Sequence, residues 1–218
     1  MLTKAQIKRR LKKIMAIFFR VRLKNKDFSI LSNNCWGGVI YDKYALPYRT
    51  PTIGLWIPPD DYIKFLRNLE YYCGQEMKQI KYTECHVREL LEERKKSGRY
   101  NFELETLIIG RIVDVDIIFI HYSSFEDAKQ KWDRRKCRLN TNNLLVKMND
   151  QNNCTKQNMV DFLALDYHNK IFFSGNEEWK DYEGVTYLEK YKAAGYVVND
   201  TARGDVKLDT TSILNKLK

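Results

Sequence analysis

The chain has 218 residues, of which 44% are hydrophobic and 30% charged, and its formal net charge is +10 at neutral pH. This length supports one sizeable hydrophobic core and is short for two. The sequence has no run of about 18 apolar residues and no cleavable leader pattern, so we expect neither a transmembrane helix nor a signal peptide. The five cysteines form no CxxC pair, which argues against a disulfide framework or a zinc site and favours a cytoplasmic location.

All of the excess positive charge lies in the first 26 residues. That segment holds 10 of the 38 Lys and Arg residues and none of the 28 Asp and Glu residues, so 28 cations balance 28 anions in the remainder. Nucleic-acid-binding folds usually spread their positive charge over the body, so we expect no nucleic-acid partner. We place a boundary near Lys26, between a basic amphipathic N-terminal helix (1–26) and an α/β domain (27–218).

Apolar residues recur at helical spacing along the N-terminal segment. They are Ile7, Leu11, Ile14, Met15 and Phe18, with Ile17 and Val21 widening the same face. Two interpretations stay open. The helix could lie on an anionic membrane surface with its apolar side in the lipid, which would make the protein peripheral at the inner face of the cell membrane. Alternatively, it could dock on the domain and leave a solvated basic face.

After this segment, strand and helix patterns alternate along the chain. Strands are predicted over 28–32, 52–57, 107–113, 115–121, 144–148 and 170–174, with a weaker one over 79–83. Helices are predicted over 39–46, 59–73 and 155–165, and from Ser123 or Ser124 to about Lys136. Residues 117–120 are apolar throughout, which is typical of a central strand covered on both faces. We therefore predict an α/β fold with a mostly parallel central sheet and helices on both faces.

Cys35 follows the first predicted strand, inside a polar, Gly-rich turn over residues 33–38. His121 ends the most apolar strand, so it would reach the same edge of the sheet if the strands are parallel. Backbone N–H groups of such a turn can lower the pKa of a thiol and hold an oxyanion. We predict Cys35 as a nucleophile and His121 as its general base, the alternative being a structural cysteine near a core histidine.

The same turn also allows a function without a covalent step. Asn33, Asn34 and the backbone of Gly37 and Gly38 could hold a sugar or a phosphate. Trp36 could stack on a sugar face, or it could cover the core.

A dense basic run follows Trp132. Arg134 and Arg138 lie on one face of the predicted helix, and with Arg135 they could take a phosphate group of a nucleotide or of coenzyme A. Asn140 could extend this polar site or shape a turn. A solvated helix face is the alternative.

Other polar residues carry weaker signals. His86 lies in a charged stretch and His168 in a turn, so neither is assigned a catalytic role. Asp114 and Asp116 alternate on a strand and fit a salt bridge at its rim better than a pair of catalytic carboxylates. The sequence has no HExxH, GxSxG, P-loop or GxGxxG motif, and we expect no metal.

Four segments resemble a bacterial family, domain-of-unknown-function family 1919, whose members are often called exopolysaccharide-biosynthesis proteins. They are FSILSNNCWGG (28–38), YRTPTIGL (48–55), FIHY (119–122) and KWDRR with RLN (131–140), and the resemblance spans about residues 26–200. It implies sugar or lipid-linked sugar substrates, because members are associated with polysaccharide or capsule gene neighbourhoods. The turn that holds Cys35 is also similar, more distantly, to capsule acetyltransferases that bind coenzyme A and use a Cys–His pair.

Together these patterns and the resemblance lead us to expect an acyl (acetyl) transferase of exopolysaccharide or capsule synthesis, with acyl-CoA as donor. The alternative is a non-catalytic sugar-phosphate or glycan-binding module, or a glycosyltransferase accessory protein at the membrane surface. The residues expected to bind substrate are Asn33, Asn34, Trp36, Gly37, Gly38, Thr50, Thr52, Tyr122, Trp132, Arg134, Arg135, Arg138 and Asn140.

Overall fold

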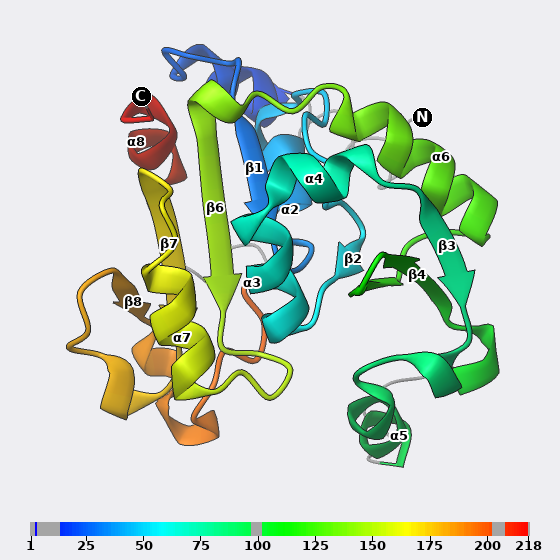
Figure 1. The fold of residues 1–218 in the computed structure, drawn as a ribbon. Helices are drawn as coiled ribbons and strands as arrows, with labels where there is room; N and C mark the ends of the chain where they lie inside the picture. The colour runs from blue at the N-terminus through cyan, green and yellow to red at the C-terminus, as the bar shows by residue number, and fades with distance from the viewer. Residues whose placement is uncertain (1–2, 4–13, 97–101, 202–207, 218) are drawn as a thin grey trace.

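The structure, a computed structural model, describes residues 3, 14–96, 102–201 and 208–217. This part of the chain forms an α/β fold that contains two four-stranded sheets (Figure 1). One sheet is parallel, with strand order β1-β6-β7-β8. The other is antiparallel, with order β2-β5-β4-β3.

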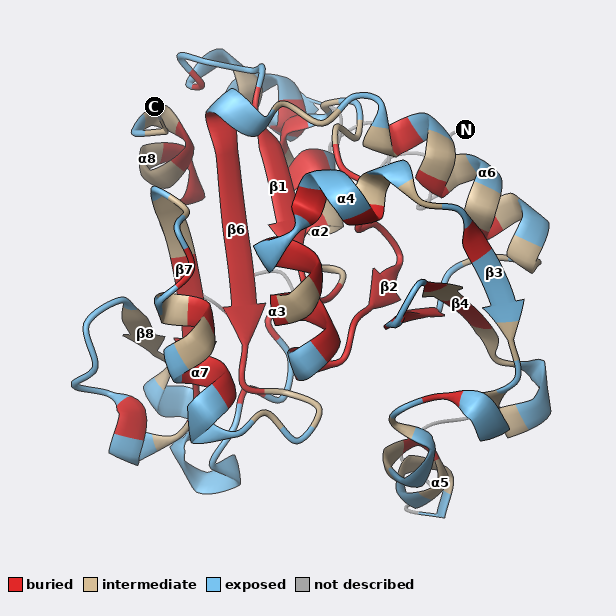
Figure 2. Cartoon of the chain, in the orientation of Figure 1, coloured by how far each residue is buried: buried red, intermediate tan, exposed pale blue. Residues whose placement is uncertain are grey.

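The parallel sheet consists of β1 (Ser29–Ser32), β6 (Leu144–Asn149), β7 (Asn169–Ser174) and β8 (Val185–Tyr187). Every residue of β1 and of β6 is buried, which Figure 2 shows along both strands. Both strands are buried along their whole length because helices cover both of their faces. The carboxyl ends of all four strands lie at the same edge of the sheet.

The antiparallel sheet consists of β2 (Leu55–Trp56), β3 (Met77–Ile80), β4 (Ile108–Ile112) and β5 (Val115–Phe119). Only Val113 and Asp114 separate β4 from β5, and Val113 adopts a left-handed backbone with φ 57°. A two-residue connection joins antiparallel neighbours, whereas parallel strands need a crossover of a dozen or more residues. The expectation of a single, mostly parallel sheet that includes residues 107–121 is therefore wrong.

Helices cover both faces of the parallel sheet, as predicted. On one face α2 (Trp36–Tyr44) and α8 (Thr210–Asn215) pack on Ile30, Leu145 and Phe173. On the other face α3 (Pro59–Arg67) and α7 (Lys156–Leu163) pack on Leu31, Val146 and Phe172. This second core also includes Val115, Ile117 and Phe119 of β5, so it joins the two sheets.

The remaining helices connect these layers. The predicted helix over 59–73 is two helices, because Asn68 (φ −134°) is not helical and separates the end of α3 from α4 (Leu69–Gly74). The Ser124 hydroxyl accepts the Asp127 N–H at 3.1 Å and so caps α6 (Phe125–Lys136), as predicted. α5 (Arg88–Lys96) lies over the antiparallel sheet. Short 3-10 helices are η1 (Tyr82–Glu84), η2 (Leu104–Thr106), η3 (Thr141–Asn143), η4 (Glu177–Trp179) and η5 (Glu189–Ala194).

In the N-terminal segment, residues 14–21 form a helix. Ala16 and Leu23 are buried, and Phe19 packs against the core cluster that contains α2. The apolar face predicted from the sequence points away from the body, whereas Ile7 and Leu11 lie outside the described residues. None of the helices in the described ranges is long and apolar enough to cross a bilayer.

Candidate functional site: a cavity beside a buried lysine

A buried polar network surrounds Lys147 near the carboxyl ends of β1 and β6. The Lys147 side chain has no exposed surface. Its Nζ donates to the amide oxygens of Asn34 (3.1 Å) and Asn33 (3.4 Å), and it forms an ion pair with Asp200. The three N–H donors of the ammonium thus find three acceptors, which is the condition for keeping a charge inside a protein.

Asp200 comes from the C-terminal part of the chain and is also buried. Its carboxylate accepts the side-chain amide N–H groups of Asn34 (2.8 Å) and Asn149 (2.9 Å). Burial lowers the pKa of Lys147, and the negative charge of Asp200 opposes that shift. The ion pair therefore ties the segment around Asp200 to the edge of the parallel sheet.

A cavity of about 660 Å³ opens beside this network. Asn34, Cys35 and Asp200 line it from the side of the parallel sheet. Trp56 of β2 and His121, which follows β5, line it from the antiparallel sheet. This volume lies within the range of small-molecule sites, and the mixture of apolar walls and a few polar groups is typical of them.

Cys35 faces this cavity as a neutral thiol. It is the residue before α2, and its Sγ donates to the Leu55 carbonyl at 3.7 Å. Burial raises the pKa of Cys35 to about 11, although the hydrogen bond to Leu55 works against the shift. The start of α2 therefore does not provide the lowered thiol pKa that the sequence led us to expect.

His121 lines the same cavity and is exposed. Its backbone N–H donates to the Gly54 carbonyl at 3.2 Å, which joins the residue after β5 to the segment before β2. Among the described residues, no hydrogen bond connects the His121 imidazole with the Cys35 thiol. The two side chains thus share one cavity without forming a bonded pair.

Tyr122 also lines the cavity, and its phenol is held from two sides. The hydroxyl donates to the Ile53 carbonyl and accepts Nη1 of Arg135 at 2.7 Å. Arg135 is buried, and its guanidinium lies 5.0 Å from the Tyr48 ring centroid. Arg135 therefore positions Tyr122 and is not a lining residue of the cavity.

The two tryptophans predicted to bind substrate lie in the core. Trp36 is 3% exposed and makes an edge contact with Phe173, the ring centroids being 5.7 Å apart. Trp132 is 1% exposed and packs on Phe65. Neither ring has a free face for a sugar, so the candidate site leaves both out.

The other predicted substrate residues shape the backbone around the site or lie away from it. Thr50 and Thr52 are buried, and the Thr52 hydroxyl accepts the Ser32 N–H at 3.1 Å. The Asn140 side chain donates to the Asp27 carbonyl at 3.0 Å. Arg134 and Arg138 are exposed, and Gly37 and Gly38 lie in the first turn of α2. None of these four residues lines the cavity.

Sequence reasoning missed several polar residues at or beside the cavity, among them Lys147, Gln151, Asp200 and Arg94. One of them carried a signal, because Lys147 is the single charged residue in the apolar strand predicted over 144–148. Arg94 belongs to α5, and its guanidinium lies 5.1 Å from the ring centroid of Trp56. The sequence around Asp200 gave no sign that it folds back onto the sheet.

The family model described as a domain of unknown function, DUF1919, matches residues 6–213. The chain belongs to the DUF1919 family. This confirms the predicted resemblance and places both sheets and both walls of the cavity inside the matched region. An uncharacterized protein of Haemophilus influenzae is similar to this chain, with 23% identity over 176 residues that cover 81% of this chain and 75% of that protein.

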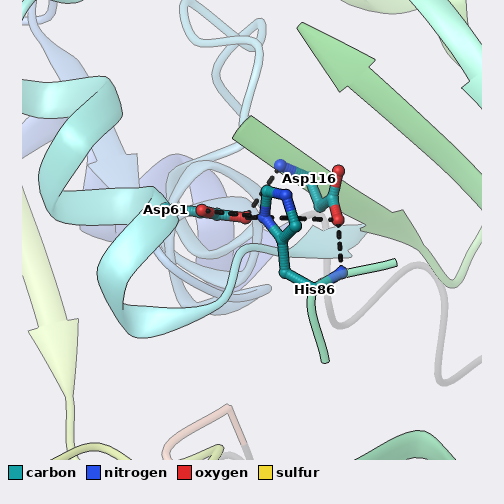
Figure 3. A group of neighbouring side chains, drawn as sticks. All are labelled: Asp61, His86 and Asp116. Atoms are coloured by element: carbon teal, nitrogen blue, oxygen red, sulfur yellow. Dashed lines mark hydrogen bonds and ion pairs between the residues drawn. The ribbon is translucent and has the colours of Figure 1, made fainter. Parts of the chain in front are cut away.

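The DUF1919 domain has a second polar cluster, formed by Asp61 of α3, Asp116 of β5 and His86 (Figure 3). His86 Nδ1 lies 3.0 Å from Asp61 Oδ2 and 3.5 Å from Asp116 Oδ2. Arg111 binds both carboxylate oxygens of Asp116, through Nε at 2.6 Å and Nη2 at 2.9 Å. The salt bridge expected for Asp116 is present, although its carboxylate is buried and not at a rim.

The charges of this second cluster are largely compensated from within. Burial raises the pKa of Asp116, but the hydrogen bonds from Arg111 and from the His86 backbone, together with the charges of both residues, outweigh it and the net shift is downward. Asp61 accepts the Asp116 backbone N–H at 2.9 Å, and burial raises its pKa. The donor atoms are close enough together to hold a metal ion, but Arg111 already supplies the cation on Asp116. We assign the cluster to stability, because it links α3, β5 and the segment before α5.

Proposed function

We propose that this DUF1919 domain binds a phosphorylated sugar in the cavity between its two sheets and works as a binding module in the synthesis of a cell-surface polysaccharide. The proposal rests on one observation, which is that the two walls of the cavity present different polar groups. One wall presents the carboxylate of Asp200 and the amides of Asn34 and Gln151. The opposite wall presents His121, and Arg94 of α5 lines the cavity with its guanidinium donating to the Asn152 side chain.

These two walls complement the two chemical parts of a sugar phosphate. Carboxylate and amide oxygens accept hydrogen bonds from sugar hydroxyls, and amide N–H groups donate hydrogen bonds to them. The planar guanidinium of Arg94 is oriented by the Trp56 ring and suits a phosphate group, and His121 adds a nitrogen donor on the same side. The resemblance to exopolysaccharide-biosynthesis proteins supports a sugar as the other part of the ligand.

Isothermal titration calorimetry with glucose 1-phosphate and UDP-glucose tests this function. We expect saturable binding of at least one of them, and a loss of about tenfold or more in affinity for Arg94→Gln, since a charge-assisted hydrogen bond is removed. Arg138→Gln is the matched control, because Arg138 is exposed and lies outside the cavity. Equal losses in both variants, or no binding of either ligand, would contradict the proposal.

Acyl transfer is the second candidate, supported by the presence of Cys35 and His121 in one cavity. In that reaction the Cys35 sulfur attacks the carbonyl carbon of an acyl-CoA and the bond to the CoA sulfur breaks. His121 carries the thiol proton to the departing CoA thiolate, and the acyl group then passes to a sugar hydroxyl, whose proton returns to Cys35. This candidate ranks second because the thiol pKa is raised and the pair lacks a hydrogen bond.

Incubation with radiolabelled acetyl-CoA separates the two candidates. If the chain transfers acyl groups, it acquires a label that hydroxylamine removes. Cys35→Ala abolishes this label, whereas Cys137→Ala, which changes an exposed thiol, retains it. Under the binding proposal, neither variant acquires label and sugar-phosphate affinity survives Cys35→Ala.

A further inference from the structure

The N-terminal helix exposes a continuous row of apolar side chains, which we call the apolar ridge. Its members have exposed fractions of 51–76% and are Ile14, Met15, Ile17, Phe18 and Val21. Their spacing places them on one side of the helix. Scattered single apolar residues on a surface need no explanation, but five on one short helix form a patch of the kind that marks a binding surface.

The ridge is held in a fixed position on the body. On the opposite side of the helix, Ala16 is buried and Phe19 makes an edge contact with Tyr44 of α2, the ring centroids being 6.4 Å apart. Just after the helix, the Asn215 side chain accepts the Lys24 N–H at 2.8 Å and donates to the Arg22 carbonyl at 3.0 Å. The exposed side chains therefore point outward as part of the folded protein.

Charge decides which partner suits the ridge. The first 26 residues contain 10 cations and no anion. Two copies of this chain meeting ridge to ridge would bring these like charges together, which is unfavourable. An anionic lipid surface instead offers negative headgroups to the basic residues and hydrocarbon to the apolar ones.

We propose that the apolar ridge docks the protein on an anionic membrane surface. Ile17 and Phe18 enter the boundary between headgroups and acyl chains. Arg22 lies at the level of the lipid phosphates, and its guanidinium is 5.9 Å from the Phe18 ring centroid, so cation and apolar side chain are adjacent. This docking does not depend on the ligand of the cavity.

Vesicle co-sedimentation of the full chain tests this inference. We expect binding to phosphatidylcholine vesicles that contain about 30% phosphatidylglycerol, at least about tenfold weaker binding to pure phosphatidylcholine, and release by high salt. The double variant Ile17→Gln/Phe18→Gln changes exposed side chains, so it stays folded, and we expect it to lose about tenfold or more of the binding. Its matched control is Val113→Asn/Val160→Gln, which changes two exposed apolar residues elsewhere.

Three results would overturn the inference. One is the absence of binding to the anionic vesicles, and another is equal binding by the wild-type chain and the Ile17→Gln/Phe18→Gln variant. The third is self-association in sedimentation velocity that only this variant abolishes, because the ridge would then be covered by a second copy of the chain. Calorimetry with the sugar-phosphate ligands gives an independent readout, since the ridge variant leaves the cavity unchanged.

Discussion

Replacing the buried lysine, Lys147→Met, tests the polar network that borders the cavity. The variant removes the ammonium and leaves the Asp200 carboxylate buried without its cation, together with the amide oxygens of Asn33 and Asn34. Breaking a buried ion pair on one side costs about 3–5 kcal/mol of unfolding free energy. Since a domain of this size has a total of about 5–15 kcal/mol, the loss is a large fraction of its stability.

The assay is urea unfolding at neutral pH, followed by tryptophan fluorescence. The double variant Lys147→Met/Asp200→Asn removes both charges, and we expect it to regain at least about 1.5 kcal/mol relative to Lys147→Met alone. Lys64→Met is the control for losing a lysine. Lys64 pairs with Asp114 at 2.9 Å, but its side chain is partly exposed to solvent, so its loss costs about 1 kcal/mol or less. If Lys147→Met costs no more than Lys64→Met, the reasoning about a buried and compensated charge is refuted.

Three further predictions concern the site and the cluster that stabilises it. The rate of Cys35 alkylation by iodoacetamide should rise about tenfold per pH unit up to the thiol pKa of about 11, because burial disfavours the thiolate. Exposed Cys137 should react faster than Cys35 at neutral pH, and site-resolved mass spectrometry measures both rates. Gly54→Ala should cost about 1–2 kcal/mol in urea unfolding, because φ is +68° and an added Cβ would lie 3.2 Å from the Cβ of His121. Asp116→Asn should cost about 1.5–3 kcal/mol at neutral pH. Because the pKa of Asp116 is lowered from 3.8 in the folded state, its carboxylate stabilises the fold above pH 3.8, and this stability is lost as the pH falls through the folded pKa. The free energy of unfolding of the variant should therefore lack this acid-dependent loss.

The candidate pair of Cys35 and His121 shows how far sequence reasoning reached. The strands before both residues were located correctly, but the argument that parallel strands bring their ends to one edge was wrong for His121. The two residues meet at one cavity because β5 pairs with β2, whose preceding residue Gly54 bonds to the backbone of His121. Local patterns indicate strands, whereas which strands pair depends on contacts between distant segments.

Burial was the property that the sequence conveyed least. The turn around Cys35 is polar and rich in glycine, yet the thiol faces the Leu55 carbonyl in a buried setting that raises its pKa. Asp200 reaches the sheet through the tertiary path of the C-terminal segment, which no local motif announces. In the described part of the N-terminal segment residues 14–21 form a helix, and only the structure shows that Ala16 and Phe19 make its contacts with the body.

The most direct test of a ligand in the cavity uses Cys35 as a reporter and Cys137 as an internal control. Alkylation of both thiols is followed at alkaline pH, with and without UDP-glucose or glucose 1-phosphate at the concentration that saturates calorimetry. The sugar-phosphate proposal predicts that the ligand slows alkylation of Cys35 by about tenfold or more and leaves exposed Cys137 unchanged. Unchanged alkylation of Cys35 in the presence of both ligands would contradict it.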